Sequence, residues 1–338
     1  MAQRDIDTHS LLFALTPPAF HPYLMLMRLD RLSASFLLLL PTWWGIALST
    51  ALSDDIAHQP YSMMERFFAH DAPFYLLFAL AAFVMRSAGC VVNDMVDKDI
   101  DAHITRTQTR PLACGMLTQR HALATLFCLL VCALMLALAL PSTLFLPSLA
   151  ILPFIVLYPY MKRVTHYPQV MLGFLFNTGL LLAFYATTHA THHAVSLADA
   201  FPLPVVLAYA GCVLSTIAFD TVYAHMDRDD DIHVGVKSLA IRWGTRTKRY
   251  VAMLYGVAWG ALATCLLLIA HTHPHIVIQP SMLLLGVAGL LLAFFLYRLD
   301  IKSFPSCHNF FKKNVVVLFI MFIAFFVLPY APLLSPYH

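Results

Sequence analysis

Residues 89–101 read GCVVNDMVDKDID and follow an almost uninterrupted apolar run over residues 74–92. If a helix continues through them, Asn93, Asp97 and Asp101 share one face, because residues four apart are neighbours on a helix. Stacked oxygen-bearing side chains repel one another unless a cation joins them, and such ligands suit a hard ion such as Mg²⁺. Carboxylates at bilayer depth are costly and usually functional, so the stretch predicts a membrane helix that ends in a metal site.

A second acidic stretch, residues 220–231, reads DTVYAHMDRDDD and also follows an apolar run. Carboxylates cannot bind a phosphate directly, but they can hold one through Mg²⁺. Two acidic faces at the ends of hydrophobic helices therefore indicate a site that clamps one anionic ligand between them. A continuous helix would place four side chains of the second stretch on one face: Asp220, Tyr223, Asp227 and Asp231.

The composition indicates a membrane protein, because 60% of the 338 residues are hydrophobic and only 12% are charged. We predict an all-α polytopic membrane protein with a cytoplasmic amphipathic arm over residues 1–32 and a single transmembrane domain over residues 33–338. Because the acidic stretches end the second and sixth spans, we expect a bundle of two four-helix halves plus one helix. A spanning helix needs about 20 apolar residues. Nine segments qualify: 33–53, 74–95, 121–140, 143–161, 169–188, 201–221, 250–270, 276–297 and 315–334.

Basic residues predict the topology, because cytoplasmic loops are enriched in Lys and Arg. Such residues lie in the arm and in the loops after the second, fourth, sixth and eighth spans. The alternate loops hold only Arg66, and residues 331–338 hold none. We expect the N-terminus and both acidic stretches on the cytoplasmic side of a bacterial inner membrane, with the C-terminus on the opposite side. The net charge of +3 reflects these loops, so no nucleic-acid partner is expected. The first span has no recognisable cleavable signal before it and is expected to remain as an anchor.

Arg86 lies within the second predicted span, seven residues before Asn93 and nearly on the same face. A buried guanidinium needs an anionic partner. Two interpretations are open. Arg86 can form a structural ion pair with an intramembrane acid such as Asp220, or it can capture a substrate carboxylate, for which Arg has the right bidentate geometry.

Cations near the acidic stretches form a further group of candidates. Arg106 and Arg110 are four residues apart, in a stretch where Pro111 breaks the helix, and both can face a diphosphate. Lys162 follows the fourth span, and Lys237 is placed to reach back over the second acidic stretch. The alternative interpretation is ordinary positive charge on the cytoplasmic side.

The two motifs, Asn93-Asp-x-x-Asp97-x-x-x-Asp101 and Asp220-x-x-Tyr223-x-x-x-Asp227-x-x-x-Asp231, resemble those of the UbiA superfamily of intramembrane aromatic prenyltransferases. Within it, the chain is most similar to the bacterial 4-hydroxybenzoate polyprenyltransferases of ubiquinone synthesis. The likeness runs from about residue 22 to residue 245. The chain departs from the family pattern at three positions: Asp99, Ala113 and Cys114 stand where the family often has a basic residue, Pro and Ser. The supporting stretches are residues 22–28, 85–94, 158–163 and 223–231.

The resemblance implies transfer of a polyprenyl chain from its diphosphate to the ring carbon ortho to the phenol of 4-hydroxybenzoate, with the hydrocarbon tail between helices and open to membrane lipid. It implies Arg86 for the acceptor carboxylate, Asp220 to orient the phenol or take the ring proton, and Tyr223 beside them in the catalytic group. The residues implied for the departing diphosphate are Arg106, Arg110, Lys162 and Lys237. The residues implied for Mg²⁺ are Asn93, Asp97, Asp227 and Asp231, with Asp101 on the metal or behind it.

Three other interpretations remain open. A member of the same family can use another acceptor, such as a naphthoate, a haem or a chlorin. A transporter or Mg²⁺ channel would also carry membrane acids, although its sites usually rest on helices that Gly or Pro breaks within the bilayer. A purely structural membrane scaffold would leave the aligned carboxylates unexplained.

Overall fold

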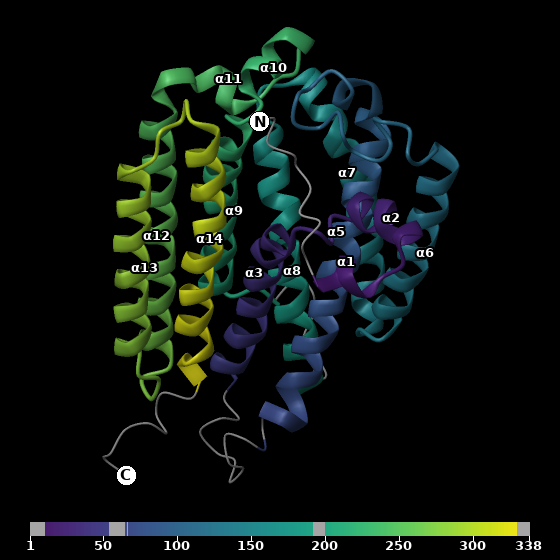
Figure 1. Ribbon diagram of the computed structural model, residues 1–338. Helices are drawn as coiled ribbons and strands as arrows, with labels where there is room; N and C mark the ends of the chain where they lie inside the picture. Colours follow the sequence, from purple (N-terminus) through teal and green to yellow (C-terminus); the bar gives the residue numbers. More distant parts are fainter. Residues whose placement is uncertain (1–10, 54–64, 66, 192–199, 330–338) are drawn as a thin grey trace.

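The computed structural model describes residues 11–53, 65, 67–191 and 200–329, and within these ranges the protein is helical and contains no strand. Nine helices of the described part are long and apolar enough to cross a membrane, as the sequence predicts. They run roughly side by side as one bundle (Figure 1). The nine are α3 (Leu32–Ala51), α5 (Ala72–Asp101), α6 (Gln119–Leu138), α7 (Phe145–Val164), α8 (Pro168–Thr191), α9 (Leu203–Ala224), α12 (Thr247–Thr272), α13 (Gln279–Tyr297) and α14 (Phe304–Phe326).

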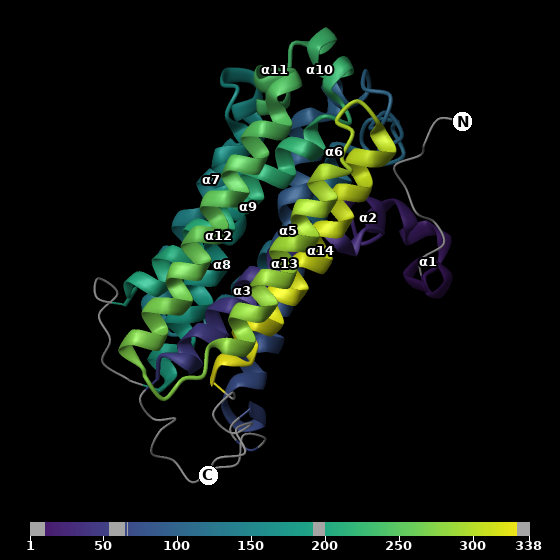
Figure 2. The same ribbon diagram turned by 90° about the vertical axis from the view of Figure 1, so that its left-hand side faces the viewer.

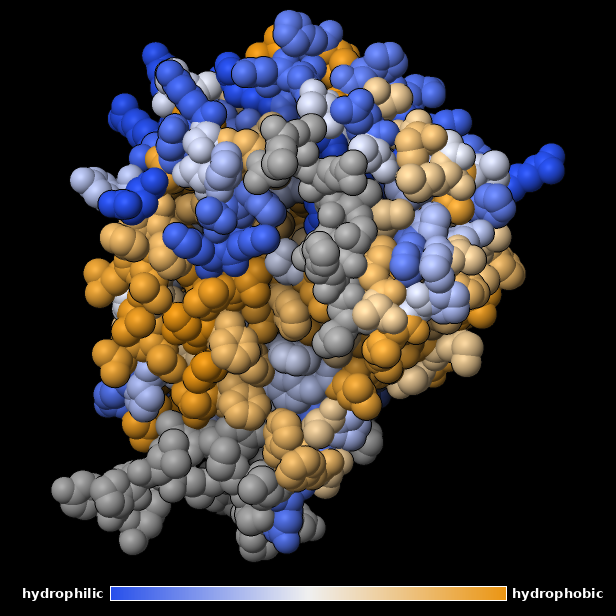
Figure 3. All heavy atoms as spheres, in the orientation of Figure 1, coloured by the Kyte–Doolittle hydropathy of each residue, from blue (hydrophilic) through white to orange (hydrophobic). Residues whose placement is uncertain are grey.

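The outer surface of the bundle is apolar. Only 6% of the most apolar stretch of α6 and 11% of that of α7 are buried within the protein. Large side chains such as Phe127, Met135 and Leu146 therefore face outward. Hydrophobic residues form a broad band across the middle of the molecule (Figure 3). Hydrophilic residues gather at the end that carries the short helices α10 (Arg228–Val234) and α11 (Leu239–Trp243). An apolar girdle around bundled helices is what a lipid environment requires, so the chain is a multi-pass membrane protein.

The centre of the bundle depends on a close approach of α3 and α8, which lie between α12–α14 on one side and α5–α7 on the other (Figure 1). A Cβ atom on Gly45 of α3 would lie 2.1 Å from the carbonyl oxygen of Leu180 in α8. In the opposite direction, a Cβ atom on Gly179 would lie 2.2 Å from Oγ1 of Thr42. Small residues let membrane helices pack backbone to backbone, so these two glycines fix the helix pair around which the others assemble.

A polar side chain joins α8 to α9. Asn177 is fully buried and donates from Nδ2 to Oγ1 of Thr216 at 2.9 Å and to the carbonyl oxygen of Gly173 at 2.8 Å. An amide inside a membrane bundle is costly unless it forms hydrogen bonds, so these contacts hold the two helices together.

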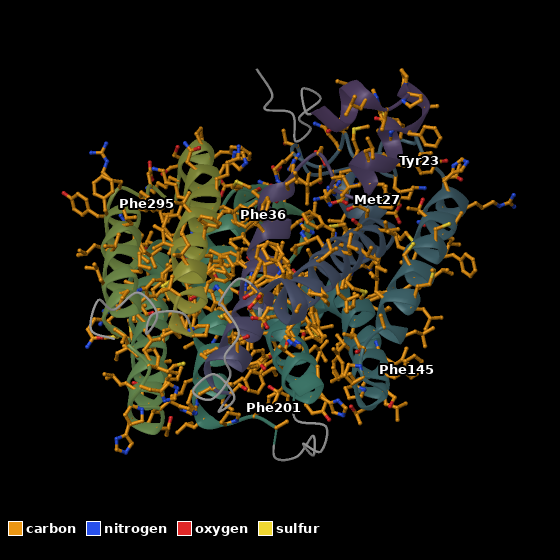
Figure 4. The ribbon with its side chains drawn as sticks, turned by 90° about the horizontal axis from the view of Figure 1, so that it is seen from below. Tyr23, Met27, Phe36, Phe145, Phe201 and Phe295 are labelled. Carbon is orange, nitrogen blue, oxygen red and sulfur yellow. The ribbon has the colours of Figure 1, made fainter. Side chains whose placement is uncertain are left out.

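The arm packs on the outside of the bundle. It comprises α1 (Leu11–Leu15), the 3₁₀ turn η1 (Pro18–Phe20) and α2 (His21–Leu26), and α2 contacts α5. Leu26 is buried in a cluster with Val91 of α5. Figures 1 and 2 show the arm beside the bundle, and Tyr23 and Met27, labelled in the end view of Figure 4, pack against the cluster of Leu26 and Val91. Residues 1–10 of the predicted arm, Arg66 and the predicted tail lie outside the described residues.

The last helix begins earlier than the sequence predicts. We expect a span over residues 315–334, whereas α14 covers Phe304–Phe326. The side chain of Ser303 caps its first turn by accepting a hydrogen bond from the backbone of Ser306 at 3.4 Å. The first turns of α14 bury Cys307, Phe310 and Phe311. Hydropathy alone did not find this start because the exposed face of the same turns is polar.

Candidate active site

A cavity of about 640 Å³ opens between α3, α5, α6, α7, α8 and α9, with α14 closing one side. Its deep wall is apolar and includes Leu134 of α6, Leu152 of α7 and Leu182 of α8. The end nearest α10 is polar and strongly charged. The polar residues that line this end include Arg28, Asn93, Asp94, Arg106, Arg110 and Tyr223. The cavity thus combines a charged head with a long hydrophobic compartment.

The first acidic stretch lies entirely within α5, which continues to Asp101. The predicted continuation of the helix is therefore confirmed, and Asn93 lines the cavity. Asp97 is 0% exposed and forms a short hydrogen bond with Nζ of Lys162. Asp101 accepts a hydrogen bond from Arg110 at 2.7 Å. Both carboxylates are thus neutralised by cations, Arg110 from the loop after α5 and Lys162 from the last turn of α7.

The second acidic stretch does not form one helix, so the predicted single face is wrong. α9 ends at Ala224, and the short helix α10 (Arg228–Val234) begins after a turn. A new helix is favoured there because Asp229, Asp230 and Asp231 fall in its first turn, where carboxylates stabilise the helix dipole. Asp220 and Tyr223 consequently line the cavity from α9, whereas Asp227 and Asp231 belong to the segment above it.

Asp231 sits in a distinct electrostatic environment. Its side chain is buried, and this burial, together with the nearby charge of Asp227, raises the pKa of the carboxyl to about 7. Lys162 and Arg106 act in the opposite direction. A group of this kind is held back from ionisation by acids close by, and an added cation would favour its charged form.

Arg106 connects the loop after α5 to the second acidic stretch. It extends from the loop after α5, donates from Nε to Oδ1 of Asp227 at 2.7 Å, and forms a second, shorter hydrogen bond to Oδ2. Its NH1 donates to the Tyr223 hydroxyl at 3.3 Å, and its guanidinium lies 5.4 Å from the centre of that ring. This arginine therefore fixes one acid and one aromatic side chain beside the cavity.

Lys237 does not reach over the acidic stretches as the sequence suggests. Its Nζ donates to the carbonyl oxygen of Val164 at 3.2 Å, and its backbone amide donates to the carbonyl oxygen of Lys162 at 2.8 Å. It does not line the cavity. The side chain turns toward the neighbouring loop because Gly235, with φ of +75°, ends α10 and redirects the chain.

Arg86 and Asp220 face the same cavity from α5 and α9. Among the described residues, no ion pair joins them, so the structural ion pair that the sequence left open is not formed. The Nε atom of Arg86 is buried without a hydrogen-bond partner in the described part of the chain. NH1 of Arg86 contacts the Cys90 thiol one turn along α5. A buried guanidinium with an unused donor fits an anionic ligand in the cavity.

Asp94 and Arg28 form a pair that sequence reasoning did not assign. One nitrogen of Arg28 donates to both carboxylate oxygens of Asp94, at 2.8 and 2.9 Å, and Arg110 donates to the same carboxylate at 3.2 Å. Arg28 has a φ of +57°, and among the described residues it is the non-glycine residue whose φ is positive. Strained backbone often marks functional sites. The helical register was the sequence signal that could have separated Asp94 from the predicted metal ligands, because Asp94 points about 100° away from its neighbour Asn93.

The donor set fits a hard divalent cation. It offers oxygen ligands from carboxylates and an amide, and Oδ1 of the buried Asp97 has no hydrogen-bond partner among the described residues. Within the same residues, no three acidic, His or Cys side chains already converge as a metal cluster. The carboxylates are instead paired with Lys162, Arg106 and Arg110. Binding of a metal–diphosphate complex would replace these ion pairs, because the carboxylates would then bind the metal and the cations would bind the phosphates.

Comparison with known proteins places this arrangement in a family. The sequence profile described as the UbiA prenyltransferase family matches residues 38–326. The chain belongs to the UbiA family. A UbiA relative from Caenorhabditis elegans, named as a mitochondrial 4-hydroxybenzoate polyprenyltransferase, is 34% identical, with 98% of this chain and 87% of the relative covered. A relative from Azotobacter vinelandii, named as a 4-hydroxybenzoate octaprenyltransferase, is 37% identical, with 72% and 74% covered.

The fold of this UbiA family member agrees with a solved structure. The UbiA homologue from Archaeoglobus fulgidus, determined with GPP and Mg²⁺ bound, superposes with a TM-score of 0.61 at 19% identity. The alignment covers 93% of this chain and 100% of the homologue. The helical bundle formed by the described residues is therefore the UbiA fold.

Proposed function

We propose that this protein transfers a polyprenyl group from polyprenyl diphosphate to the 3-position of 4-hydroxybenzoate, releasing diphosphate, in ubiquinone biosynthesis. The observation that carries the proposal is the cavity that joins a charged head, built from both acidic stretches, to an apolar compartment. A prenyl diphosphate has the same division between an anionic head and a hydrocarbon tail. The names of the C. elegans and A. vinelandii relatives support 4-hydroxybenzoate as the acceptor.

The apolar compartment suits a long isoprenoid. It runs along α5 from Asn93 to Phe78, a separation of fifteen residues that corresponds to about 22 Å of helix. Its wall includes residues of α6 and α7, the two most lipid-exposed spans. A tail longer than the compartment would continue into the surrounding lipid, where burying its CH₂ groups costs nothing further.

The oxygen ligands of the charged head would hold Mg²⁺. Asn93, Asp97 and Asp101 on α5 would bind on one side, and Asp227 and Asp231 on the other. When bound, the metal would supply positive charge to the diphosphate and so stabilise it as a leaving group. The A. fulgidus homologue with bound GPP and Mg²⁺ supports this choice of ion.

The chain's own residues would carry the remaining steps. The bond between the allylic carbon and the diphosphate oxygen breaks, and its electron pair leaves with the diphosphate, whose charge Arg106, Arg110 and Lys162 would stabilise. The ring carbon ortho to the phenol hydroxyl then bonds to the allylic carbon. Asp220 would accept the proton that this ring carbon loses. The apolar wall excludes water, which would otherwise capture the allylic cation.

The acceptor would enter with its carboxylate toward Arg86. The guanidinium faces the cavity with an unused donor, and two parallel hydrogen bonds to a carboxylate would orient the ring. Tyr223 lines the same cavity from α9, and Arg106 holds its hydroxyl in place. The phenol end of the ring would then point toward Asp220.

The distribution of cations supports an orientation in the membrane. Arg106, Arg110, Lys162 and Lys237 all lie at the end that carries α10, so this end and the charged head would face the cytoplasm or an equivalent compartment. The membrane would be the bacterial inner membrane. We also propose that residues 33–338 act as a single domain with the arm as an accessory.

Membranes that contain the protein test the proposal directly. They would be supplied with 4-hydroxybenzoate, a short prenyl diphosphate and Mg²⁺, with and without a chelator. We expect chelator-sensitive 3-prenyl-4-hydroxybenzoate, its loss in Asp97→Ala and Asp227→Ala, and its retention in Asp229→Ala, whose side chain is 91% exposed. If product forms only with another acceptor, that compound and not 4-hydroxybenzoate is the substrate. If the membranes take up Mg²⁺ without forming any product, the protein is a transporter and not a prenyltransferase.

A further inference from the structure

The segment that contains α10, residues 226–238, is tied to the loop after α5 and to the last turn of α7. Oδ2 of Asp230 accepts a hydrogen bond from the backbone amide of Thr105 at 2.9 Å. At the other end of the segment, Lys237 donates to the carbonyl oxygens of Lys162 and Val164, at 2.8 and 3.2 Å. The segment therefore connects the loop after α5 with the last turn of α7.

Each of these attachments adjoins a cation of the charged head. Thr105 directly precedes Arg106, whose side chain pairs with Asp227 and contacts Tyr223. Residues 102–118 contain no helix and are held by local turn hydrogen bonds, such as that from Thr107 to Ile104 at 3.0 Å. The contact with Asp230 fixes the backbone directly before Arg106, so its loss would leave that part of the loop freer to move, and Arg106 with it.

Asp230 is oriented differently from the acids assigned to the metal. Its carboxylate accepts a hydrogen bond from the backbone of the loop, whereas Asp97, Asp101 and Asp227 are bonded to the side chains of cations. Its neighbour Asp229 provides a natural comparison, because this side chain is 91% exposed and pairs with Arg228 on the surface. Two adjacent aspartates thus differ in the one contact that reaches the loop.

We propose that Asp230 is a positioning residue: its carboxylate fixes the backbone of Thr105 and thereby holds Arg106 at the diphosphate end of the cavity. Asp230 does not bind the metal. This inference rests on the proposed function for the identity of the ligand that Arg106 meets. The contact between Asp230 and the loop is independent of that function.

Three variants separate a hydrogen-bond acceptor from a required negative charge. Asp230→Ala removes the acceptor, whereas Asp230→Asn removes the charge but keeps an oxygen that accepts a hydrogen bond. Asp229→Ala serves as the control on the adjacent residue. Losing a hydrogen bond to a charged group corresponds to about a tenfold change in an equilibrium constant, so we expect the KM for prenyl diphosphate to rise about tenfold in Asp230→Ala. Asp230→Asn should stay within about threefold of wild type, because its amide oxygen replaces the acceptor.

The Mg²⁺ concentration at half-maximal rate should be the same in wild type and in all three variants. A residue that binds the metal would behave differently, because Asp230→Asn would then raise this concentration as much as Asp230→Ala. That result would overturn the proposal, and so would an unchanged KM in Asp230→Ala.

Hydrogen–deuterium exchange of the peptide over residues 102–118 supplies a readout that needs no turnover. We expect faster exchange in Asp230→Ala than in wild type, Asp230→Asn or Asp229→Ala. Thr105→Pro removes the donor from the other side of the bond and should raise the KM in the same way as Asp230→Ala. If the wild type forms no prenylated product, the proposed function fails. The exchange rates then still decide the inference, because equal rates in wild type and Asp230→Ala would refute it.

Discussion

Asp94 offers a quantitative test of how the charged head is assembled. Its side chain is 1% exposed, and the arginines that donate to it are 12% exposed for Arg28 and 13% for Arg110. Removing one member of a buried ion pair costs about 3–5 kcal/mol, because the remaining charge stays buried without compensation. Arg110 retains Asp101 at 2.7 Å, so the loss falls mainly on Arg28. We therefore expect Asp94→Asn to lower the free energy of unfolding by about 3 kcal/mol, the lower end of this range.

Equilibrium unfolding in mixed detergent micelles, followed by tryptophan fluorescence, measures this change. Asp229→Asn is the matched control, because it removes the same charge from an exposed side chain and should change the stability little. The double variant Arg28→Met/Asp94→Leu should recover part of the loss, because both charges leave together. A loss below about 1 kcal/mol in Asp94→Asn, the range of a surface ion pair, would refute the reasoning. So would a double variant that is no more stable than Asp94→Asn.

Activity assays of Asp94→Asn distinguish the orientation of arginines from the binding of metal. We expect a higher KM for prenyl diphosphate, because Arg28 and Arg110 lose their common anchor beside the cavity. The Mg²⁺ concentration at half-maximal rate should stay unchanged. A large increase in that concentration would instead make Asp94 a metal ligand.

Two further variants test the packing and the acceptor site. Gly45→Ala should lower the free energy of unfolding by about 3 kcal/mol, because the new Cβ would lie 2.1 Å from a backbone oxygen of α8. Gly256→Ala, in a helix position with nothing within 4 Å, should be neutral or stabilising, and equal stability of the two variants would contradict the close helix approach. Arg86→Met should raise the KM for 4-hydroxybenzoate at least about tenfold and leave the KM for prenyl diphosphate unchanged. The KM of Arg86→Lys for 4-hydroxybenzoate should lie between those of the wild type and Arg86→Met. Equal rises for both substrates would exclude a specific role for Arg86 at the acceptor carboxylate.

Local sequence patterns carried much of the architecture. Long apolar runs located the nine spans, because each must be about 20 residues long to cross a bilayer. The continuous helix through Asn93, Asp97 and Asp101 followed from the same reasoning, since no residue of that stretch stops a helix. The need of Asn177 for a polar partner was also predictable, because burial of an amide within a membrane requires one.

Other features depended on contacts between distant segments. The turn between Asp220 and Asp231 was not predicted, because side-chain periodicity does not show where one helix ends and a second begins. The pairing of Arg28 with Asp94 joins residues 66 positions apart, and that of Arg106 with Asp227 joins residues 121 positions apart. Lys237 had a suitable charge and position for the charged head, but the turn at Gly235 directs its side chain to Val164.

The sequence by itself predicted the nine candidate membrane spans found in the described part of the chain, where its acidic stretches lie, and which chemistry they suit. These properties follow from hydropathy, helical period and ligand type, all of which are local. Only the tertiary structure decided which cation faces which acid, which aspartates meet the cavity, and how the loops are tied together. The physical reason is that buried charges must be paired, and the available partners depend on how the helices pack in three dimensions.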